Sequence, residues 1–311
     1  MKPLRFLLLL ALACAADHTH AQTKPSGQTA TYTRTEDVVY GRKFGTALTL
    51  DVFQPTTIKP NGFGIIQVIS GGWVSSHTNI SAASIQTYLD RGYTVFTVVH
   101  GSQPKFTLAE IVPDLHRAVR FIRQNAARWA IDPAHLGITG SSAGGHLSLT
   151  LGTQGGPGPV DAKDPIDRAS SAVQAVACFY PPTDFLNYGR EGEIAVGSGI
   201  LKDYIPAFGP EALTPAGRQK LGQTFSPARY LSAASAPTLI IHGDADPLVP
   251  IQQSQLYVAR ATAAGATARL IVKPGAEHGG KTWPDIAGDR RRLADWFDHY
   301  LRGLPMAATD Y

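Results

Sequence analysis

Three residues of this sequence have the types and the order that nucleophilic catalysis by serine requires. Ser142 stands midway between the glycines of Gly140-Ser-Ser-Ala-Gly144, which fits the G-x-S-x-G pattern of a serine on a tight turn between a strand and a helix. A serine hydroxyl is a poor nucleophile until a base removes its proton, and that base needs an orienting group behind it. Asp246 lies 104 residues after Ser142, and His278 lies 32 residues after Asp246; they are predicted to be the acid and the base. Ser141 competes with Ser142 but is not centred between the glycines.

Other residues near these positions have side chains of the same types. Asp244 lies in the same segment as Asp246, and spacing alone does not separate the two as the acid. His278 lies among glycine and proline residues on a polar loop, which argues against a buried structural histidine. We expect His242, at the end of a strand, to be a packing or turn residue. We expect His146, one helical turn after the serine, to be a satisfied core histidine.

Attack by a serine places negative charge on a carbonyl oxygen, and backbone N–H groups commonly stabilise that charge. One predicted donor is the N–H of Ala143, the residue after the nucleophile. The other is expected in the loop after an early apolar strand, which reads Val68-Ile-Ser-Gly-Gly-Trp73. Glycines in that loop allow the backbone to approach a substrate closely.

The elements around these residues alternate between strands and helices. Apolar or alternating runs of strand length predict strands at 36–40, 47–53, 64–69, 93–99, 136–139, 173–179, 238–242 and 268–272. Apolar residues at helical spacing predict helices at 82–91, 107–129, 143–151, 252–264 and 287–301. This alternation predicts an α/β domain with a mostly parallel central sheet and helices on both of its faces.

The N-terminal segment has the pattern of an export signal. Basic residues precede an apolar run at 6–13, and small residues before Gln22 offer a cleavage site, so residues 1–21 are predicted to be a signal peptide. The run is too short to span a bilayer comfortably, and no stable membrane insertion is expected. An imperfect lipoprotein box ending at Cys14 is the alternative. The predicted location is therefore the periplasm or the medium.

The rest of the chain is predicted to be a flexible leader at 22–34 and one hydrolase domain at 35–311. Residues 181–235 interrupt the alternation with scattered glycine and proline, and are predicted to form a lid or substrate-binding insert. Its aromatic residues suit an acyl or aryl group, and Tyr188 and Tyr204 are the candidates for substrate contact. The small size of the insert predicts short acyl chains, from acetyl to butyryl.

Composition excludes several classes of partner. A formal net charge of +4 is too small and too dispersed to predict binding to nucleic acid or to an anionic membrane. After signal cleavage only Cys178 remains, so no intrachain disulfide is expected, and its apolar run predicts an inert core residue. No C-x-x-C motif or histidine cluster is present, so neither a metal nor a cofactor is predicted. Oligomeric state is left open.

From about residue 38 to residue 301 the chain resembles the α/β-hydrolase fold serine esterases, in the group of feruloyl and acetyl-xylan esterases and the related hormone-sensitive-lipase-like carboxylesterases. The matching segments are Gly140-Ser-Ser-Ala-Gly-Gly-His146, Asp132-Pro133, Ala236-Pro-Thr-Leu-Ile-Ile-His-Gly-Asp-Ala-Asp246 and His278. In the family pattern H-G-x-x-D the acid is the second aspartate, so the resemblance implies Asp246 rather than Asp244.

The chain departs from this family at its H-G-G-x-W run. Aligned on Trp73, that run is Ile69-Ser-Gly-Gly-Trp73 here, which implies oxyanion amides at Gly71 and Gly72 beside that of Ala143. A register slipped by one residue implies Gly72 and Trp73 instead. The family's histidine is missing in both registers, and since that histidine shapes the loop rather than doing chemistry, activity is expected to persist.

The sequence therefore predicts an exported serine carboxylesterase that hydrolyses short-chain acyl or aryl esters through an acyl-enzyme. Acetyl and feruloyl groups on plant polysaccharide are candidate substrates, as the resemblance implies. A serine peptidase of the prolyl-oligopeptidase type has the same catalytic order, and a non-catalytic binding protein on a hydrolase scaffold is a third reading. Hydrolysis of a short p-nitrophenyl ester separates the binding protein from the two enzymes.

Overall fold

The computed structural model describes residues 31–306. The predicted signal peptide, the alternative anchor at Cys14 and residues 22–30 of the predicted leader lie outside this range. Eight strands are present: β1 (Tyr32–Lys43), β2 (Thr46–Pro55), β3 (Gly64–Ile69), β4 (Thr94–Val99), β5 (Leu136–Ser141), β6 (Ala175–Phe179), β7 (Thr238–Gly243) and β8 (Ala268–Lys273). Each strand predicted from the sequence is among them.

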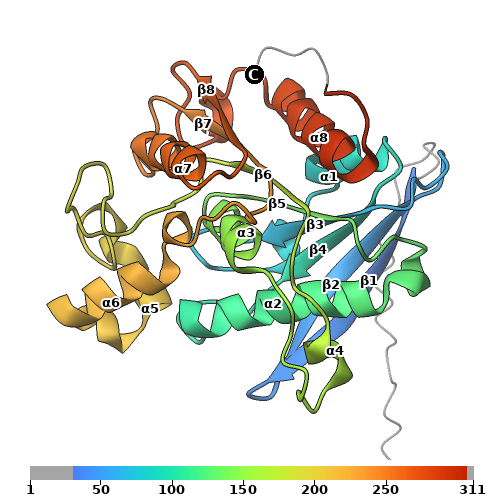
Figure 1. Cartoon of the computed structure of the whole chain (residues 1–311), viewed down its shortest axis with the longest axis horizontal. Helices are drawn as coiled ribbons and strands as arrows, with labels where there is room; N and C mark the ends of the chain where they lie inside the picture. The colour runs from blue at the N-terminus through green and yellow to red at the C-terminus, as the bar shows by residue number, and fades with distance from the viewer. Residues whose placement is uncertain (1–30, 307–311) are drawn as a thin grey trace, which may run out of the picture. The chain divides into compact units, whose positions relative to one another are not determined.

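The strands form one sheet in the order β1-β2-β4-β3-β5-β6-β7-β8 (Figure 1). Neighbours from β4 to β8 pair in parallel, whereas β1 with β2 and β2 with β4 pair antiparallel. The mostly parallel sheet expected from the sequence is confirmed. The predicted leader boundary was wrong at one end, because β1 begins at Tyr32, where that residue pairs with Pro55 of β2.

Eight α-helices connect or flank the strands: α1 (Ala82–Leu89), α2 (Leu108–Gln124), α3 (Ala143–Gln154), α4 (Pro165–Arg168), α5 (Ile205–Phe208), α6 (Pro215–Phe225), α7 (Gln252–Ala263) and α8 (Ile286–Arg302). Short 3₁₀ helices are η1 (His77–Asn79), η2 (Ala126–Trp129), η3 (Gly199–Tyr204), η4 (Pro210–Leu213), η5 (Pro227–Arg229) and η6 (Gly280–Thr282). The single helix predicted at 107–129 ends instead at Gln124, because Asn125 leaves helical geometry and η2 follows. Pro113 is accommodated inside α2.

Helices cover both faces of the sheet (Figure 1). On one face, apolar side chains of α2, α3 and α7 pack on the strands in the larger core. On the other face α1 and α8 contribute Tyr88 and Phe297, whose rings meet at 5.8 Å. Cys178 is fully buried in the larger core, and burial raises the pKa of its thiol, so its predicted inert role fits.

The segment 181–235 runs from β6 to β7 and contains only η3, α5, η4, α6 and η5 (Figure 1). Several of its apolar residues are buried in the larger core, among them Phe185, Leu201 and Phe208. The insert is therefore a packed part of the domain. Across residues 31–306, no helix has both the length and the apolar character that a bilayer crossing demands.

Candidate active site

Ser142 lies on the turn between β5 and α3, with φ 54° and ψ −121°. Its backbone N–H donates to the carbonyl of Phe179 on β6 at 3.0 Å, which holds the turn against the sheet. The flanking glycines are required by space: a Cβ on Gly140 would lie 2.4 Å from the backbone of Gly144. A Cβ on Gly144 would lie 2.7 Å from the Val68 carbonyl oxygen. The turn thus presents a serine in a strained conformation that regular structure does not allow.

The structure brings the three predicted residues together from three separate loops. His278 Nε2 lies 2.8 Å from Ser142 Oγ, and His278 Nδ1 lies 2.6 Å from Asp246 Oδ2. A carboxylate only accepts, so the proton is on Nδ1 and Nε2 is free to accept from the serine hydroxyl. The ring of Tyr180 packs against the imidazole at a centroid distance of 4.5 Å. This arrangement can move a proton from Ser142 to His278.

Asp246 is 9% exposed and is surrounded by hydrogen-bond donors. Its Oδ1 accepts from the N–H groups of Leu248 and Val249, both at 2.8 Å. Its Oδ2 accepts from His278 and also from Nε2 of His242, the latter at 3.2 Å. Burial alone would raise the pKa of Asp246, but the hydrogen bonds from His242, His278 and Val249 outweigh burial and hold the pKa well below its usual range. The carboxylate is therefore charged wherever His278 can act.

The competing aspartate and the two other histidines have different surroundings. Asp244 is exposed, and its Oδ1 accepts from the N–H of Gly275 at 2.7 Å, away from His278. His146 is fully buried between the Trp73 indole N–H and the Phe225 carbonyl, as expected for a core histidine. His242 was underestimated as a packing or turn residue, since its ring bonds the acid. Its position four residues before Asp246 was the only signal in the sequence.

The loop after β3 forms a turn around Gly72 and Trp73, the two residues of the slipped register. The N–H of Gly71 donates to the Val74 carbonyl at 3.0 Å and that of Val74 donates back at 2.9 Å, so the Gly71 amide predicted in the first register is already engaged. The two residues inside this turn, Gly72 and Trp73, have φ of 54° and 62°. Among residues 31–306, the N–H groups of these two residues have no backbone partner. Both residues line the cavity at Ser142, as does Ala143, whose N–H is the first of α3.

Trp73 holds this turn in its strained conformation. The indole is 2% exposed, its N–H donates to Nδ1 of His146 at 3.2 Å, and its ring packs on Tyr204 and Phe208. A positive φ is costly for a residue with a side chain, by roughly 1–3 kcal/mol. Burial of an aromatic ring of this size offsets that cost. The packing of Trp73 therefore fixes the direction of the backbone N–H groups.

Ser70, the residue after β3, is hydrogen-bonded to a histidine from a distant part of the chain. Ser70 Oγ lies 2.9 Å from Nε2 of His100, whose Nδ1 lies 2.6 Å from the Gly101 carbonyl oxygen. Because a carbonyl only accepts, His100 Nδ1 carries the proton and Nε2 accepts from Ser70. The Ser70 carbonyl in turn accepts from the N–H of Gly144 on α3 at 3.2 Å. These bonds tie the loop after β3 to both β4 and the serine turn.

A cavity of about 20 Å³ opens beside Ser142. The insert supplies part of its wall through Pro182, Leu201 and Tyr204, which leaves Tyr204 as the candidate for substrate contact. The prediction for Tyr188 was wrong: this residue is 2% exposed, does not line the cavity, and donates its hydroxyl to the Leu248 carbonyl at 3.1 Å. Tyr188 packs beneath the wall because its ring stacks on Phe185 in the core.

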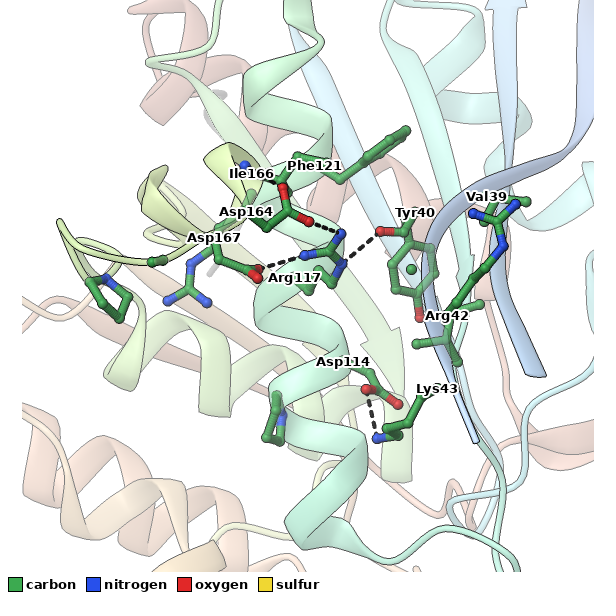
Figure 2. Close-up of a pocket in the computed structure, with 16 residues that line it drawn as sticks. Val39, Tyr40, Arg42, Lys43, Asp114, Arg117, Phe121, Asp164, Ile166 and Asp167 are labelled. Atoms are coloured by element: carbon green, nitrogen blue, oxygen red, sulfur yellow. Dashed lines mark hydrogen bonds and ion pairs between the residues drawn. The ribbon is translucent and has the colours of Figure 1, made fainter. Parts of the chain in front are cut away.

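A much larger cavity, of about 830 Å³, lies between β1, α2 and α4 (Figure 2). Several of its charged side chains form ion pairs: Lys43 with Asp114 at 2.7 Å, and Arg117 with Asp164 and Asp167 at 2.6 and 2.8 Å. None of the three predicted catalytic residues lines it. The larger cavity is therefore separate from the residues predicted to react, whereas the small cavity is lined by Ser142.

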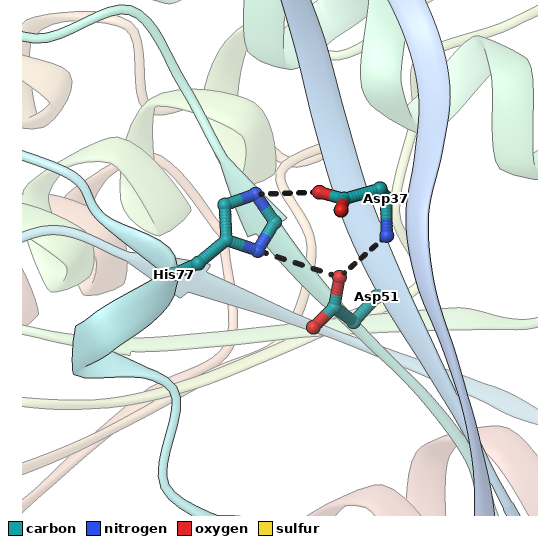
Figure 3. Close-up of side chains that lie close together, drawn as sticks. All are labelled: Asp37, Asp51 and His77. Carbon is teal, nitrogen blue, oxygen red and sulfur yellow. Dashed lines mark hydrogen bonds and ion pairs between the residues drawn. The ribbon is translucent and has the colours of Figure 1, made fainter. Parts of the chain in front are cut away.

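One cluster among the described residues has side chains of metal-ligand type: Asp37, Asp51 and His77 lie with their ligand atoms within 4.8 Å of one another (Figure 3). Arg34 donates to Asp51 Oδ2 at 2.9 and 2.5 Å and so neutralises this buried carboxylate. His77 Nε2 lies 2.7 Å from Thr49 Oγ1. A cation would have to compete with Arg34 for Asp51, so the cluster fits a metal poorly. It is better described as an ion-pair network.

Comparison with known proteins gives one family model and several relatives that are named as esterases. The BD-FAE family model matches residues 50–260. Esterase LipQ of Mycobacterium tuberculosis is 27% identical over 254 residues, which are 79% of this chain and 57% of that protein. Acetylxylan esterase of Xylanibacter ruminicola is 25% identical over 225 residues, which are 71% of this chain and 41% of that protein. The chain spans about half the length of the curated relatives it matches.

One solved structure matches over a larger share of both chains than these curated relatives do. A truncated form of a carbohydrate esterase from gut microbiota matches with a TM-score of 0.72 and 27% identity, covering 88% of this chain and 98% of that one. A match of this extent shows that the two chains have the same fold.

Proposed function

The chain belongs to the BD-FAE family and has the α/β-hydrolase fold of esterases, and from this premise we propose that it is a serine carboxylesterase. The observation that carries the proposal is the contact of His278 Nε2 with Ser142 Oγ at 2.8 Å, with Asp246 behind the histidine. In this order, an ionised acid orients a neutral imidazole, and the imidazole removes the proton of the serine hydroxyl as the oxygen attacks.

The proposed reaction has two halves. Ser142 Oγ passes its proton to His278 Nε2 and attacks the ester carbonyl carbon, and the N–H groups of Gly72, Trp73 and Ala143 bind the resulting oxyanion. His278 then gives the proton to the leaving alcohol as the C–O bond breaks, which leaves an acyl group on Ser142. A water deprotonated by His278 attacks this acyl carbon. Collapse releases the carboxylic acid and returns the proton to Ser142.

The acyl group of the substrate is proposed to be acetyl. The cavity at Ser142 measures about 20 Å³. A cavity of this size favours a small acyl group over a long chain. The Tyr204 ring lies directly on the oxyanion loop, since a Cβ on Gly72 would lie 2.5 Å from Tyr204 Cε1. This narrows the range of acyl groups expected from the sequence and disfavours feruloyl esters.

The alcohol half of the substrate is proposed to be a sugar hydroxyl. Two of the similar proteins are an acetylxylan esterase and a carbohydrate esterase, which supports an acetylated polysaccharide as the substrate class. Export fits such a substrate, because polysaccharides lie outside the cytoplasm, and residues 1–21 have the pattern of a signal peptide. N-terminal sequencing of the mature protein tests export: an N-terminus at Gln22 supports it, and an unprocessed chain contradicts it.

The function is tested with a series of p-nitrophenyl esters from acetate to octanoate, and with acetate release from acetylated xylan. The matched blank is Ser142→Ala, which removes only the hydroxyl. We expect the highest kcat/KM on the acetate and no turnover by the variant. Equal rates for the wild type and Ser142→Ala, or faster turnover of octanoate than of acetate, contradict the proposal. Cleavage of a peptide amide in preference to the esters identifies a peptidase instead.

A further inference from the structure

His242 lies at the end of β7, fully buried, and makes no contact with Ser142. Its Nε2 lies 2.9 Å from the Val249 carbonyl oxygen, and its Nδ1 lies 2.7 Å from Ser254 Oγ. Because a carbonyl only accepts, the proton must be on Nε2, and Nδ1 then accepts from the Ser254 hydroxyl. These two neighbours thus fix the orientation of the buried imidazole and the nitrogen that donates toward Val249.

This tautomer directs an N–H group at the acid. His242 Nε2 lies 3.2 Å from Asp246 Oδ2, the same oxygen that accepts from His278 Nδ1 at 2.6 Å. We infer that His242 is a positioning residue, which holds Asp246 Oδ2 in line with His278 and, by sharing its charge, sets the pH above which His278 acts as a base. The inference rests on the proposed esterase function and assigns a role to a residue outside the serine, acid and histidine set.

The direction of the expected pH shift follows from how Asp246 Oδ2 divides its negative charge between two imidazoles. A carboxylate oxygen that already accepts one N–H bond stabilises a neighbouring imidazolium less than an oxygen that accepts none. Removal of His242 therefore makes Asp246 a stronger partner for protonated His278, and the histidine releases its proton at higher pH. A hydrogen bond to a charged group has a strength that corresponds to a shift of roughly one pH unit.

Other titratable groups around the pair do not account for such a shift. Tyr180 packs on the His278 ring and Tyr188 donates to the carbonyl of Leu248, and burial raises the pKa of both phenols. Neither phenol therefore changes charge in the acidic range. Asp244 and Glu277 lie on the same loops but are exposed, so solvent screens their charges. His242 is the neighbour that donates directly to the acid.

The test compares His242→Leu with His242→Gln, whose amide N–H can replace the Nε2 donor. For the leucine variant we expect kcat/KM on p-nitrophenyl acetate to fall about tenfold to a hundredfold and its acidic limb to move up by roughly one pH unit. The glutamine variant should recover most of the lost activity and reverse most of the shift of the acidic limb. The matched control is His116→Leu, which also removes a histidine bonded to a serine, Ser171, but on α2. The His116→Leu variant should leave the acidic limb of the pH profile at the same pH as in the wild type.

A loss of activity in His242→Leu with an unmoved limb and no recovery in His242→Gln overturns the inference and leaves a merely structural residue. If the leucine variant does not fold, ¹⁵N NMR of the wild-type histidines at pH 8 decides, since a proton on His242 Nδ1 instead of Nε2 is incompatible with donation to Asp246. Failure of the esterase function itself is a separate result, because it shows in the wild type and in Ser142→Ala.

Discussion

Replacing Asp246 by asparagine should abolish most of the activity for a reason visible in its surroundings. Its two oxygens each face two N–H groups: Oδ1 those of Leu248 and Val249, Oδ2 those of His242 and His278. An asparagine amide must turn its NH₂ group toward one of these pairs. If it faces the backbone pair, two buried N–H groups lose their acceptor, at about 1–3 kcal/mol of stability each.

If the NH₂ group of the Asp246→Asn variant faces the imidazoles, His278 can satisfy it only with an unprotonated Nδ1. The proton then sits on Nε2, which points at Ser142 and cannot accept the serine proton. Loss of the working tautomer lowers kcat by about 10⁴-fold, or about 5.4 kcal/mol in activation free energy. The assay is the initial rate of p-nitrophenyl acetate hydrolysis, with a thermal melt by circular dichroism to show that the variant is folded.

The control for Asp246→Asn is Asp244→Asn. Asp244 is exposed and accepts only the Gly275 N–H at 2.7 Å, so its amide should change the rate by less than about threefold, as for other surface substitutions. Equal losses in the two variants, or an Asp246→Asn variant that keeps more than a tenth of wild-type kcat, refute the assignment of the acid.

Three further outcomes can be measured on the same material. Ser142→Ala should lose on the order of 10⁶-fold in kcat without a change in melting temperature, since no part of the sheet depends on that hydroxyl, and a surviving activity contradicts the nucleophile. Leu201→Ala, which opens the wall of the acyl cavity, should raise the butyrate-to-acetate ratio of kcat/KM by roughly tenfold, and an unchanged ratio contradicts the position of the acyl group. Burial lowers the pKa of both His100 and His146 to about 4, so the unfolded chain binds more protons than the folded protein below about pH 6.5. Stability should therefore fall as pH drops from 6.5 toward 4, and a melting temperature that rises over this range refutes the buried neutral state.

Much of the fold was predictable because each element carries a local signal. The parallel strands are continuous apolar runs, and their ends lie within two residues of the predicted ends. The errors have non-local causes. Tyr32 enters β1 because Pro55 and its neighbours offer a partner strand, and helix α2 stops at Gln124 although the apolar spacing continues to Trp129. The strand order, which comes from long-range pairing, could not be read from any local pattern.

In the candidate site, too, some features could be predicted from local sequence signals and others could not. Ser142 and His278, which the structure places 2.8 Å apart, could be proposed from the sequence because their motifs combine residue type with position between elements. The sequence left two registers open for the loop after β3, because its turn depends on a tryptophan at positive φ, and this conformation is rare for a residue with a side chain. The role of His242 depends on which ring nitrogen faces the acid, and only the contacts with Val249 and Ser254 determine that.

Backbone strain at this site is held by side-chain packing and hydrogen bonds. Among the described residues other than glycine, six have positive φ, and three of them surround the reaction: Trp73, Ser142 and Tyr180. Each conformation costs roughly 1–3 kcal/mol and persists only because neighbours over-determine it. The ring of Trp73 is wedged among aromatic residues of the insert, and the N–H groups of Ser142 and Tyr180 donate to β6 and β7 carbonyls at 3.0 Å. The insert between β6 and β7 therefore does more than line the cavity. By packing on Trp73 it also holds the N–H groups of Gly72 and Trp73 that we propose bind the oxyanion, so loosening of that packing should lower kcat before it unfolds the domain.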